Sequence, residues 1–341
     1  MSEDLWHTIR QADGTWALPF IRVQEQTARV GSQIGPVRQA VCATNQDRAL
    51  HICVIDRIGN LWHTIRQPNG IWPFPFRKIQ DQTILVGSRV GPIQQVACAT
   101  DRAGDLHICA VDYERDLWHT IRRADGTWPF PFVRVQDQVS RVGSHIGPIQ
   151  QVACATNPNR DLHICAIDRA GNLWHTIRRA DGTWSFPFLN VQDQALGSRV
   201  GATPGVACAA NPNGDLHICT LDFPGTLWHT MRRADGTWPF PFSRVQDQTA
   251  RAGSQIGPIQ QMACATNTNG DLHICALVYA DHIGNLWHTI RQADGTWPFP
   301  FRNVQEQTRQ LGPYVGLIHH VACAADPSGD LHICAIDRAL P

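Results

Sequence analysis

The segment LWHTIRRADGTW at residues 173–184 decides the fold, because nearly the same run occurs six times in the chain. All twelve tryptophans belong to these copies, and the two tryptophans of each copy are ten residues apart. Successive copies follow at steps of 56, 56, 56, 54 and 59 residues, and a repeat of this length predicts an array of similar structural units. The tryptophans of LWHT, called the first series, are Trp6, Trp62, Trp118, Trp174, Trp228 and Trp287, and those of DGTW and its variants, the second series, are Trp16, Trp72, Trp128, Trp184, Trp238 and Trp297.

The repeat changes what a length of 341 residues implies. Chains of this size often form two domains, but repeat units bury their apolar faces against their neighbours and extend a single domain. We therefore expect residues 1–341 to form one domain of six units of about 56 residues.

The composition excludes several classes of function. Lys plus Arg equals Asp plus Glu, at 29 each, so no basic field is present to attract nucleic acid. No apolar run approaches the roughly 20 residues that a membrane helix needs. The first four residues lack the basic and apolar regions of a secretory signal. We expect a chain that is cytoplasmic as synthesised and that reaches the outside only by a non-classical route, with homo-oligomerisation left open.

The LWHT run predicts a strand. Over residues 172–179, Leu173 and His175 fall on one face, and Trp174 and Thr176 fall on the other. Alternation of this kind, rich in β-branched and aromatic residues, is typical of a β-strand.

The following residues predict a hairpin and an outer strand. The Asp-Gly pair at 181–182 readily adopts the positive φ that a hairpin turn needs. Residues 183–191 then place Trp184 and Phe186 on one face, while Pro187 cannot donate a hydrogen bond to a neighbouring strand. Because proline in a sheet belongs at an edge, this run is expected to be the outermost strand.

The second half of each repeat predicts two inner strands. A longer connection, at 136–148 in one copy, leads into VACAT at 152–156, whose small side chains suit the crowded centre of a radial array. A turn, clearest at Asn213-Gly214, separates this strand from the next, which reads DLHICAID at 161–168. Each repeat therefore contributes four strands.

The two ends of the chain are complementary. The chain begins on an LWHT strand at 5–10 and ends on a DLHICAID strand at 330–337, so the repeats are offset by half a unit. Joining these strands completes a sixth four-stranded blade and closes a ring, as β-propellers do to protect strand edges. We predict an all-β, six-bladed β-propeller of four-stranded antiparallel blades, with the N-terminal and C-terminal strands sharing one blade.

The combination of LWHTIR-x-ADG-x-W with LHICA in each unit resembles the Photorhabdus-type β-propeller lectins. The resemblance extends over essentially the whole chain and recurs six times, where the described members of that family have seven repeats. It implies a propeller that binds fucose and O-methylated sugars.

The cysteines allow two further interpretations. If Asn213-Gly214 is a two-residue turn, Cys208 lies directly opposite Cys219, at a distance that a strained disulfide tolerates. Without a secretory signal, reduced thiols packed as small apolar groups are the preferred interpretation. His217 lies on the same strand face as Cys219, and with His229 these residues form a candidate zinc set; buried histidines that bond to backbone are the preferred alternative, so no metal is expected.

Both tryptophan series are candidate carbohydrate-binding residues, with packing between blades as the alternative for each ring. Trp174 is expected near the adjoining segment that carries Arg134, Gln136, Asp137 and Ser144, and the same relation applies to the other members of the first series. The second series is expected on the edge strand toward the opposite face of the ring, as a second candidate carbohydrate-binding surface. Grooves between blades supply the apolar concavities, and charged groups supply partners for sugar hydroxyls.

Enzyme activity is not expected. A catalytic constellation is built once, whereas every polar signature of this chain recurs. Sialidases need a tyrosine nucleophile, and Tyr113, Tyr279 and Tyr314 lie at unrelated positions of the repeat. The prediction is a non-catalytic, multivalent lectin without a cofactor, whose partners are fucosylated or O-methylated glycans bound in shallow sites between blades. A propeller scaffold for protein–protein interaction is the alternative.

Overall fold

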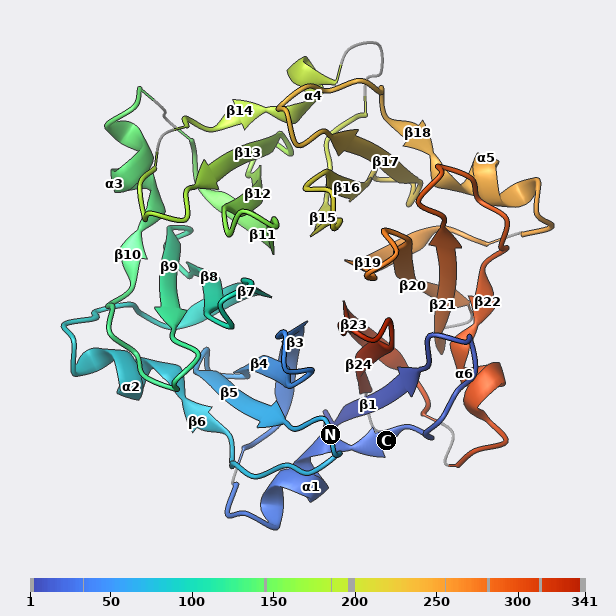
Figure 1. Ribbon diagram of the computed structural model, residues 1–341, viewed down its shortest axis with the longest axis horizontal. Coiled ribbons are helices and arrows are strands. Elements are labelled where there is room, and N and C mark those ends of the chain that lie inside the picture. Colours follow the sequence, from blue (N-terminus) through green and yellow to red (C-terminus); the bar gives the residue numbers. More distant parts are fainter. Residues whose placement is uncertain are drawn as a thin grey trace.

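A computed structural model describes residues 3–32, 34–143, 146–184, 186–195, 200–254, 256–280, 283–312 and 315–337. Within them, six sheets of four antiparallel strands stand around a central axis (Figure 1). The predicted six-bladed propeller is confirmed, including the order of strands within each blade. No helix in these ranges is long and apolar enough to cross a membrane.

Each blade runs from an inner strand at the axis to a short strand at the rim (Figure 1). The inner strands are β3 (Val37–Thr44), β7 (Ile93–Thr100), β11 (Ile149–Thr156), β15 (Gly205–Ala210), β19 (Ile259–Thr266) and β23 (Ile318–Ala325). The second strands are β4 (Leu50–Asp56), β8 (Leu106–Asp112), β12 (Leu162–Asp168), β16 (Leu216–Leu221), β20 (Leu272–Ala280) and β24 (Leu331–Asp337).

The LWHT runs form the third strands, and these are β1 (Leu5–Arg10), β5 (Leu61–Arg66), β9 (Leu117–Arg122), β13 (Leu173–Arg178), β17 (Leu227–Arg232) and β21 (Ile283–Arg291). The rim strands are β2 (Ile21–Arg22), β6 (Arg77–Lys78), β10 (Val133–Arg134), β14 (Leu189–Asn190), β18 (Ser243–Arg244) and β22 (Arg302–Asn303). Short helices follow them on the outside of the ring: α1 (Val23–Ala28), α2 (Ile79–Ile84), α3 (Val135–Ser140), α4 (Val191–Gln194), α5 (Val245–Ala250) and α6 (Val304–Thr308).

The ring closes as predicted, through a blade made from both ends of the chain. Strand β1 pairs with β24 over six residues, from Leu5 opposite Ile336 to Arg10 opposite Leu331. Because β1 also carries the rim strand β2, the first 22 residues supply half of this blade.

The rim strand is shorter than expected. Only two residues of each expected run pair with the third strand, and the segment from the Asp-Gly turn to this strand is a loop. The Thr176 hydroxyl donates to the Phe186 carbonyl at 2.8 Å, so that carbonyl is bonded to a side chain instead of a strand. Pro187 then removes a donor from the next position. The second-series tryptophans therefore stand on loops.

The two cysteines of a blade are not opposite each other, contrary to the expected register. Cys208 pairs with Ile218, because Asn211 and Asp215 close a loop of three residues. The Asn211 side chain accepts from the backbone N–H of both Asn213 and Asp215, which fixes the longer turn.

The thiols meet across the blade interfaces instead. Cys208 hydrogen-bonds to Cys165 of the preceding blade and lies in the same apolar cluster. That bond, together with burial, raises the pKa of the Cys208 thiol well above its usual value, so both groups behave as packing residues. With Cys208 and Cys219 on opposite faces of the blade, the proposed Cys₂His zinc set is not assembled.

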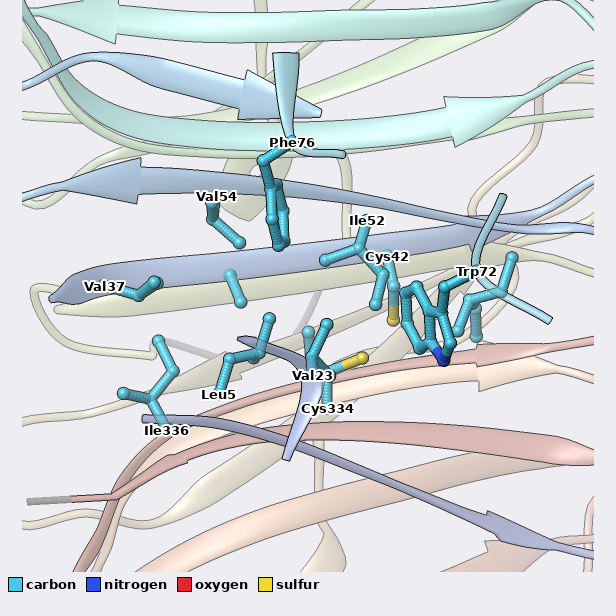
Figure 2. Close-up of a cluster of buried hydrophobic side chains, with 14 residues drawn as sticks. Leu5, Val23, Val37, Cys42, Ile52, Val54, Trp72, Phe76, Cys334 and Ile336 are labelled. Carbon is cyan, nitrogen blue, oxygen red and sulfur yellow. The ribbon is translucent and has the colours of Figure 1, made fainter. Parts of the chain in front are cut away.

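The hydrophobic core lies between blades. Figure 2 shows one of its six clusters, where Leu5 and Ile336 of the closing blade pack against Val37, Ile52 and Val54 of the next. These side chains are fully buried, so each blade depends on its neighbours for the burial of its apolar faces.

Candidate functional site

A groove lies between each of two pairs of neighbouring blades. Between the blade β11–β14 and the blade β15–β18, a cavity of about 480 Å³ is open to solvent. Between the blades β3–β6 and β7–β10, two cavities of about 90 and 620 Å³ share Ile65, Phe74 and Arg122. We call these the Arg232 groove and the Arg122 groove. The Arg232 groove is lined by His163, His175, Phe186 and Pro187 of one blade and by Arg232, Gly236 and Trp238 of the next.

The second-series tryptophans form one wall of these grooves. Trp238 meets His175 of the preceding blade edge to face, with ring centroids 6.1 Å apart. Trp128 and His63 repeat this contact in the Arg122 groove at 6.3 Å. Each indole therefore spans a blade interface, and part of its surface remains open to the groove. The same pairing joins Trp72 with His7, Trp184 with His119, and Trp297 with His229.

A pair of buried histidines lies behind each tryptophan. In one blade, Nδ1 of His163 and Nε2 of His175 share a hydrogen bond of 3.0 Å, and the rings stack. Burial is the main cause that lowers the pKa of His163 to about 4 and that of His175 well below its usual value. Both rings are therefore neutral at neutral pH. The other pairs are His7–His332, His51–His63, His107–His119, His217–His229 and His273–His288.

In each of the two grooves, the last residue of an LWHTIR-type strand contributes a guanidinium group. Arg232 ends β17, and its side chain lies over Gly236 of the following turn. Gly236 has φ of +96°, and a Cβ there would lie 3.0 Å from Nη2 of Arg232. The positive φ of the turn therefore favours glycine, and the missing side chain leaves room for the guanidinium above it. Gly126 supports Arg122 in the same way, at 3.1 Å.

The first tryptophan series lies elsewhere, around a carboxylate of its own blade. Nε1 of Trp118 donates to Asp112 at 2.8 Å, and Arg134 stands opposite Trp118 in the strand register. Arg134 forms ion pairs with Asp116 at 2.6 Å and with Asp137 at 3.2 Å. The same indole–carboxylate bond joins Trp62 with Asp56, Trp174 with Asp168, and Trp228 with Asp222.

The other expected partners of the first series have structural contacts. Gln136 accepts from the backbone N–H of Leu117 at 3.0 Å, which ties helix α3 to its strand. Trp174 belongs to the apolar cluster that also contains Val135 and Val139 of α3, whereas Arg134 itself stands opposite Trp118 in the strand register. Ser144 lies outside the described residues.

The blade β19–β22 breaks the pattern because it has no aspartate at this position. Val278 occupies the position that aspartate holds before the other tryptophans, because the β20–β21 hairpin carries the three extra residues of the sixth repeat. Nε1 of Trp287 is buried there and has no hydrogen-bond partner within the described part of the chain.

We expect Asp168→Ala to lower the free energy of unfolding by about 2–4 kcal/mol, because several buried donors lose one acceptor. The carboxylate accepts from Trp174, from the backbone of Ala170 and Asn172, and from the Asn172 side chain. Urea denaturation measures the change, and Asp193→Ala, at an exposed helical position, is the control, expected within about 0.5 kcal/mol of the parent. Equal stability of the two variants would contradict the assignment.

The groove arginines, Arg122 and Arg232, and the histidine pairs were not among the residues predicted to bind. A signal for the arginines was present, because an arginine precedes the DG turn by three or four positions in every copy. The pairing of His163 with His175 depends on the tilt of the side chains across two strands, which alternation alone does not specify.

The fold places this protein in the class of six-bladed β-propellers, with open grooves between two pairs of its blades. No protein-family model and no curated protein sequence matches the chain. Among solved structures, it is similar to AofleA from Arthrobotrys oligospora (TM-score 0.56, 10% identity, covering 96% of this chain and 81% of that one). It is also similar to the Aleuria aurantia lectin in complex with Fucα1-6GlcNAc (TM-score 0.54, 14% identity, 86% of each chain).

A propeller of a different kind also matches. Prp20p from Saccharomyces cerevisiae, described with its binding properties to Gsp1p and histones, is similar over 100% of this chain and 92% of its own, with a TM-score of 0.51 and 11% identity. At these identities the matches establish the fold, and function has to be argued from the grooves.

Proposed function

We propose that this protein is a non-catalytic, multivalent lectin of the Photorhabdus type, which binds fucose or O-methylated sugars in the grooves between its blades. The observation that carries the proposal is the repeated groove, in which an indole, a guanidinium and a histidine pair converge from two blades. An open, partly apolar concavity with a few placed polar groups is the usual form of a small-ligand site.

The chemistry of the groove suits a sugar. The open part of Trp238 and the ring of Phe186 offer apolar surface to the C–H groups of a sugar ring, to a C-methyl group or to an O-methyl group. Arg232 offers donors to ring and hydroxyl oxygens. Individual sites of this depth bind weakly, and several sites on one rigid ring raise the apparent affinity for a surface that carries many glycans.

The solved lectins of similar fold support this interpretation, since one of them is described as fucose-specific. The grooves give no support to glycosidase chemistry, because neither the Arg232 groove nor the Arg122 groove is lined by a tyrosine. Tyr113 is exposed and contacts Arg38 instead.

A protein–protein scaffold is the second candidate, and the similarity to Prp20p favours it. A scaffold for one partner diversifies its blades, whereas the Arg232 and Arg122 grooves present the same types of residue in the same places.

A glycan array that includes fucosylated and O-methylated sugars, repeated with free fucose as competitor, tests the proposal. We expect selective binding that free fucose abolishes, because the sugar occupies the groove itself. No binding by well-folded protein would reject the lectin and leave the scaffold.

Two variants test which of the two tryptophan series binds the sugar. We expect Trp238→Ala to remove one sugar site in calorimetric titration, because it strips the groove of its aromatic wall. Trp174→Phe keeps a ring in the first-series position and is expected to leave the number of sites unchanged. The reverse result would place the sugar at the first series.

A further inference from the structure

Six arginines, one in each blade, form no ion pair within the described part of the chain. Within the described ranges, no carboxylate oxygen lies within 4.0 Å of their guanidinium groups, although neighbouring arginines such as Arg179 and Arg160 form close ion pairs. The six are Arg10, Arg66, Arg122, Arg178, Arg232 and Arg291.

These guanidinium groups are partly removed from water. Burial is the main cause that lowers the pKa of Arg122 and of Arg232. In the protein, Nη1 of Arg232 makes one long hydrogen bond, 3.4 Å, to the carbonyl of Arg233. Arg66 is 7% exposed, and its Nε has no hydrogen-bond partner among the described residues. A guanidinium has five N–H donors, so most of them are left for a ligand or water.

The acidic side chains near Arg232 have ion-pair or hydrogen-bond partners of their own. Asp161 forms an ion pair with Arg179 at 2.9 Å on the other wall of the groove. Asp235 is exposed and accepts from the backbone and the hydroxyl of Thr237, within its own turn. Among the described residues that line this groove, Arg232 and Asp235 carry charges that form no ion pair within 4.0 Å, and Asp235 acts on Arg232 only from a longer distance.

The blade that carries Arg66 shows the same feature more strongly. Asn69 stands where the other turns have aspartate, so the nearest turn contributes no negative charge to Arg66. A buried or partly buried cation without an ion pair is costly to retain. Where such a cation lines an open groove, as Arg122 and Arg232 do, this points to a ligand that completes it.

We propose that the grooves select acidic sugars, in which the ring that stacks on the tryptophan, or its neighbour in the glycan, carries a carboxylate that pairs with the groove arginine. This inference rests on the proposed lectin function and adds a charged class of ligand to the neutral sugars named there. A planar carboxylate accepts two parallel hydrogen bonds from a guanidinium, and that of Arg232 lies over Gly236 in the groove. A cavity of about 480 Å³ has room for a sugar ring beside it.

Titration calorimetry with three methyl glycosides tests the proposal. Methyl β-D-glucuronide and methyl β-D-glucoside differ in the carboxylate, and methyl α-L-fucoside tests neutral binding. We expect the glucuronide to bind at least about fivefold more tightly than the glucoside, with an affinity that falls as NaCl rises from about 50 to about 500 mM because salt screens the ion pair. The affinity of the fucoside is expected to be insensitive to salt.

Substitutions identify the group responsible. In Arg122→Gln/Arg232→Gln, two of the glucuronide sites should be lost, whereas Arg251→Gln, which removes an exposed charge beyond helix α5, should retain all of them. Circular dichroism verifies folding, and the comparison of glucuronide with glucoside on the unmodified protein stands even if the double variant does not fold.

The outcomes separate the two proposals. If none of the three glycosides binds and the glycan array shows no binding, the lectin function itself is wrong. If the fucoside binds but the glucuronide binds no more tightly than the glucoside, or if the double variant keeps every glucuronide site, the lectin stands and the acidic preference is rejected.

Discussion

Lowering the pH from 7.5 to 5 is expected to unfold the propeller cooperatively. Burial lowers the pKa of His51 to about 3 and that of His163, His217 and His273 to about 4, against 6.5 for an exposed histidine. Below pH 6.5 these histidines therefore bind protons in the unfolded chain but stay neutral in the folded chain. The contribution of the neutral, buried histidines to the free energy of unfolding is complete above this pH and is lost as the pH falls toward 4.

The magnitude is large because the residues recur. Between pH 6.5 and about pH 4, each such histidine lowers the free energy of unfolding by up to about 1.4 kcal/mol for every pH unit. These four together therefore lower it by up to about 5 kcal/mol per pH unit. Their partners shift in the same direction. Total stabilities of folded domains are about 5–15 kcal/mol, so the native ring should not persist far below pH 5.

Urea midpoints at pH 7.5, 6.5 and 5.5 measure this dependence. Carboxylates do not account for it: the pKa of Asp101 is about 2, since His107 and Arg160 outweigh its burial, and its contribution is lost only below about pH 4. The double variant His163→Leu/His175→Leu removes one pair and should reduce the slope. A midpoint that stays constant from pH 7.5 to 5.5 would contradict the assignment of neutral, buried pairs.

Much of the fold could be predicted because the repeated motifs show where each structural unit begins and ends. The half-unit offset between the two ends specified which strands share a blade, and alternation in LWHT specified which residues face a neighbour. Two details could not be read in this way. The Asn211 side chain converts an apparent Asn-Gly hairpin into a longer turn, and this shifts the register of Cys208. The Thr176–Phe186 bond takes the expected rim strand out of the sheet.

The candidate grooves were harder to predict for a geometric reason. Each is built from two blades, so residues more than fifty positions apart in the sequence, such as His175 and Trp238, form one wall. Periodicity assigns a side chain to a face of its own blade but does not say which group of the next blade it meets. Tryptophan stands out in the sequence because all twelve copies recur with the repeat, whereas the interest of Arg232 comes from its place in the groove and from having no ion pair among the described residues.

Removing residues 1–10 is expected to abolish the folded ring, an effect larger than that of a single substitution such as Asp168→Ala. The deletion removes β1, whose Leu5 and His7 are fully buried, and leaves β2 without a strand to pair with. It also exposes the edge of β24 along six residue pairs and the apolar cluster of Figure 2. The remaining chain keeps five complete blades but cannot bury the faces on either side of the gap.

A circular permutant separates the loss of the strand from the loss of ring closure. The backbones of Asp4 and Asp337 are hydrogen-bonded at 3.1 Å, so β24 can be joined to β1 through a four-residue turn like that at 169–172. This permutant begins at Gln11 and ends at Arg10, and it should unfold within a few degrees of the parent in thermal denaturation. The truncated chain should show no cooperative transition. A truncated chain that melts like the parent, or a permutant that fails to fold, would contradict closure by a shared blade as the source of the stability of the ring.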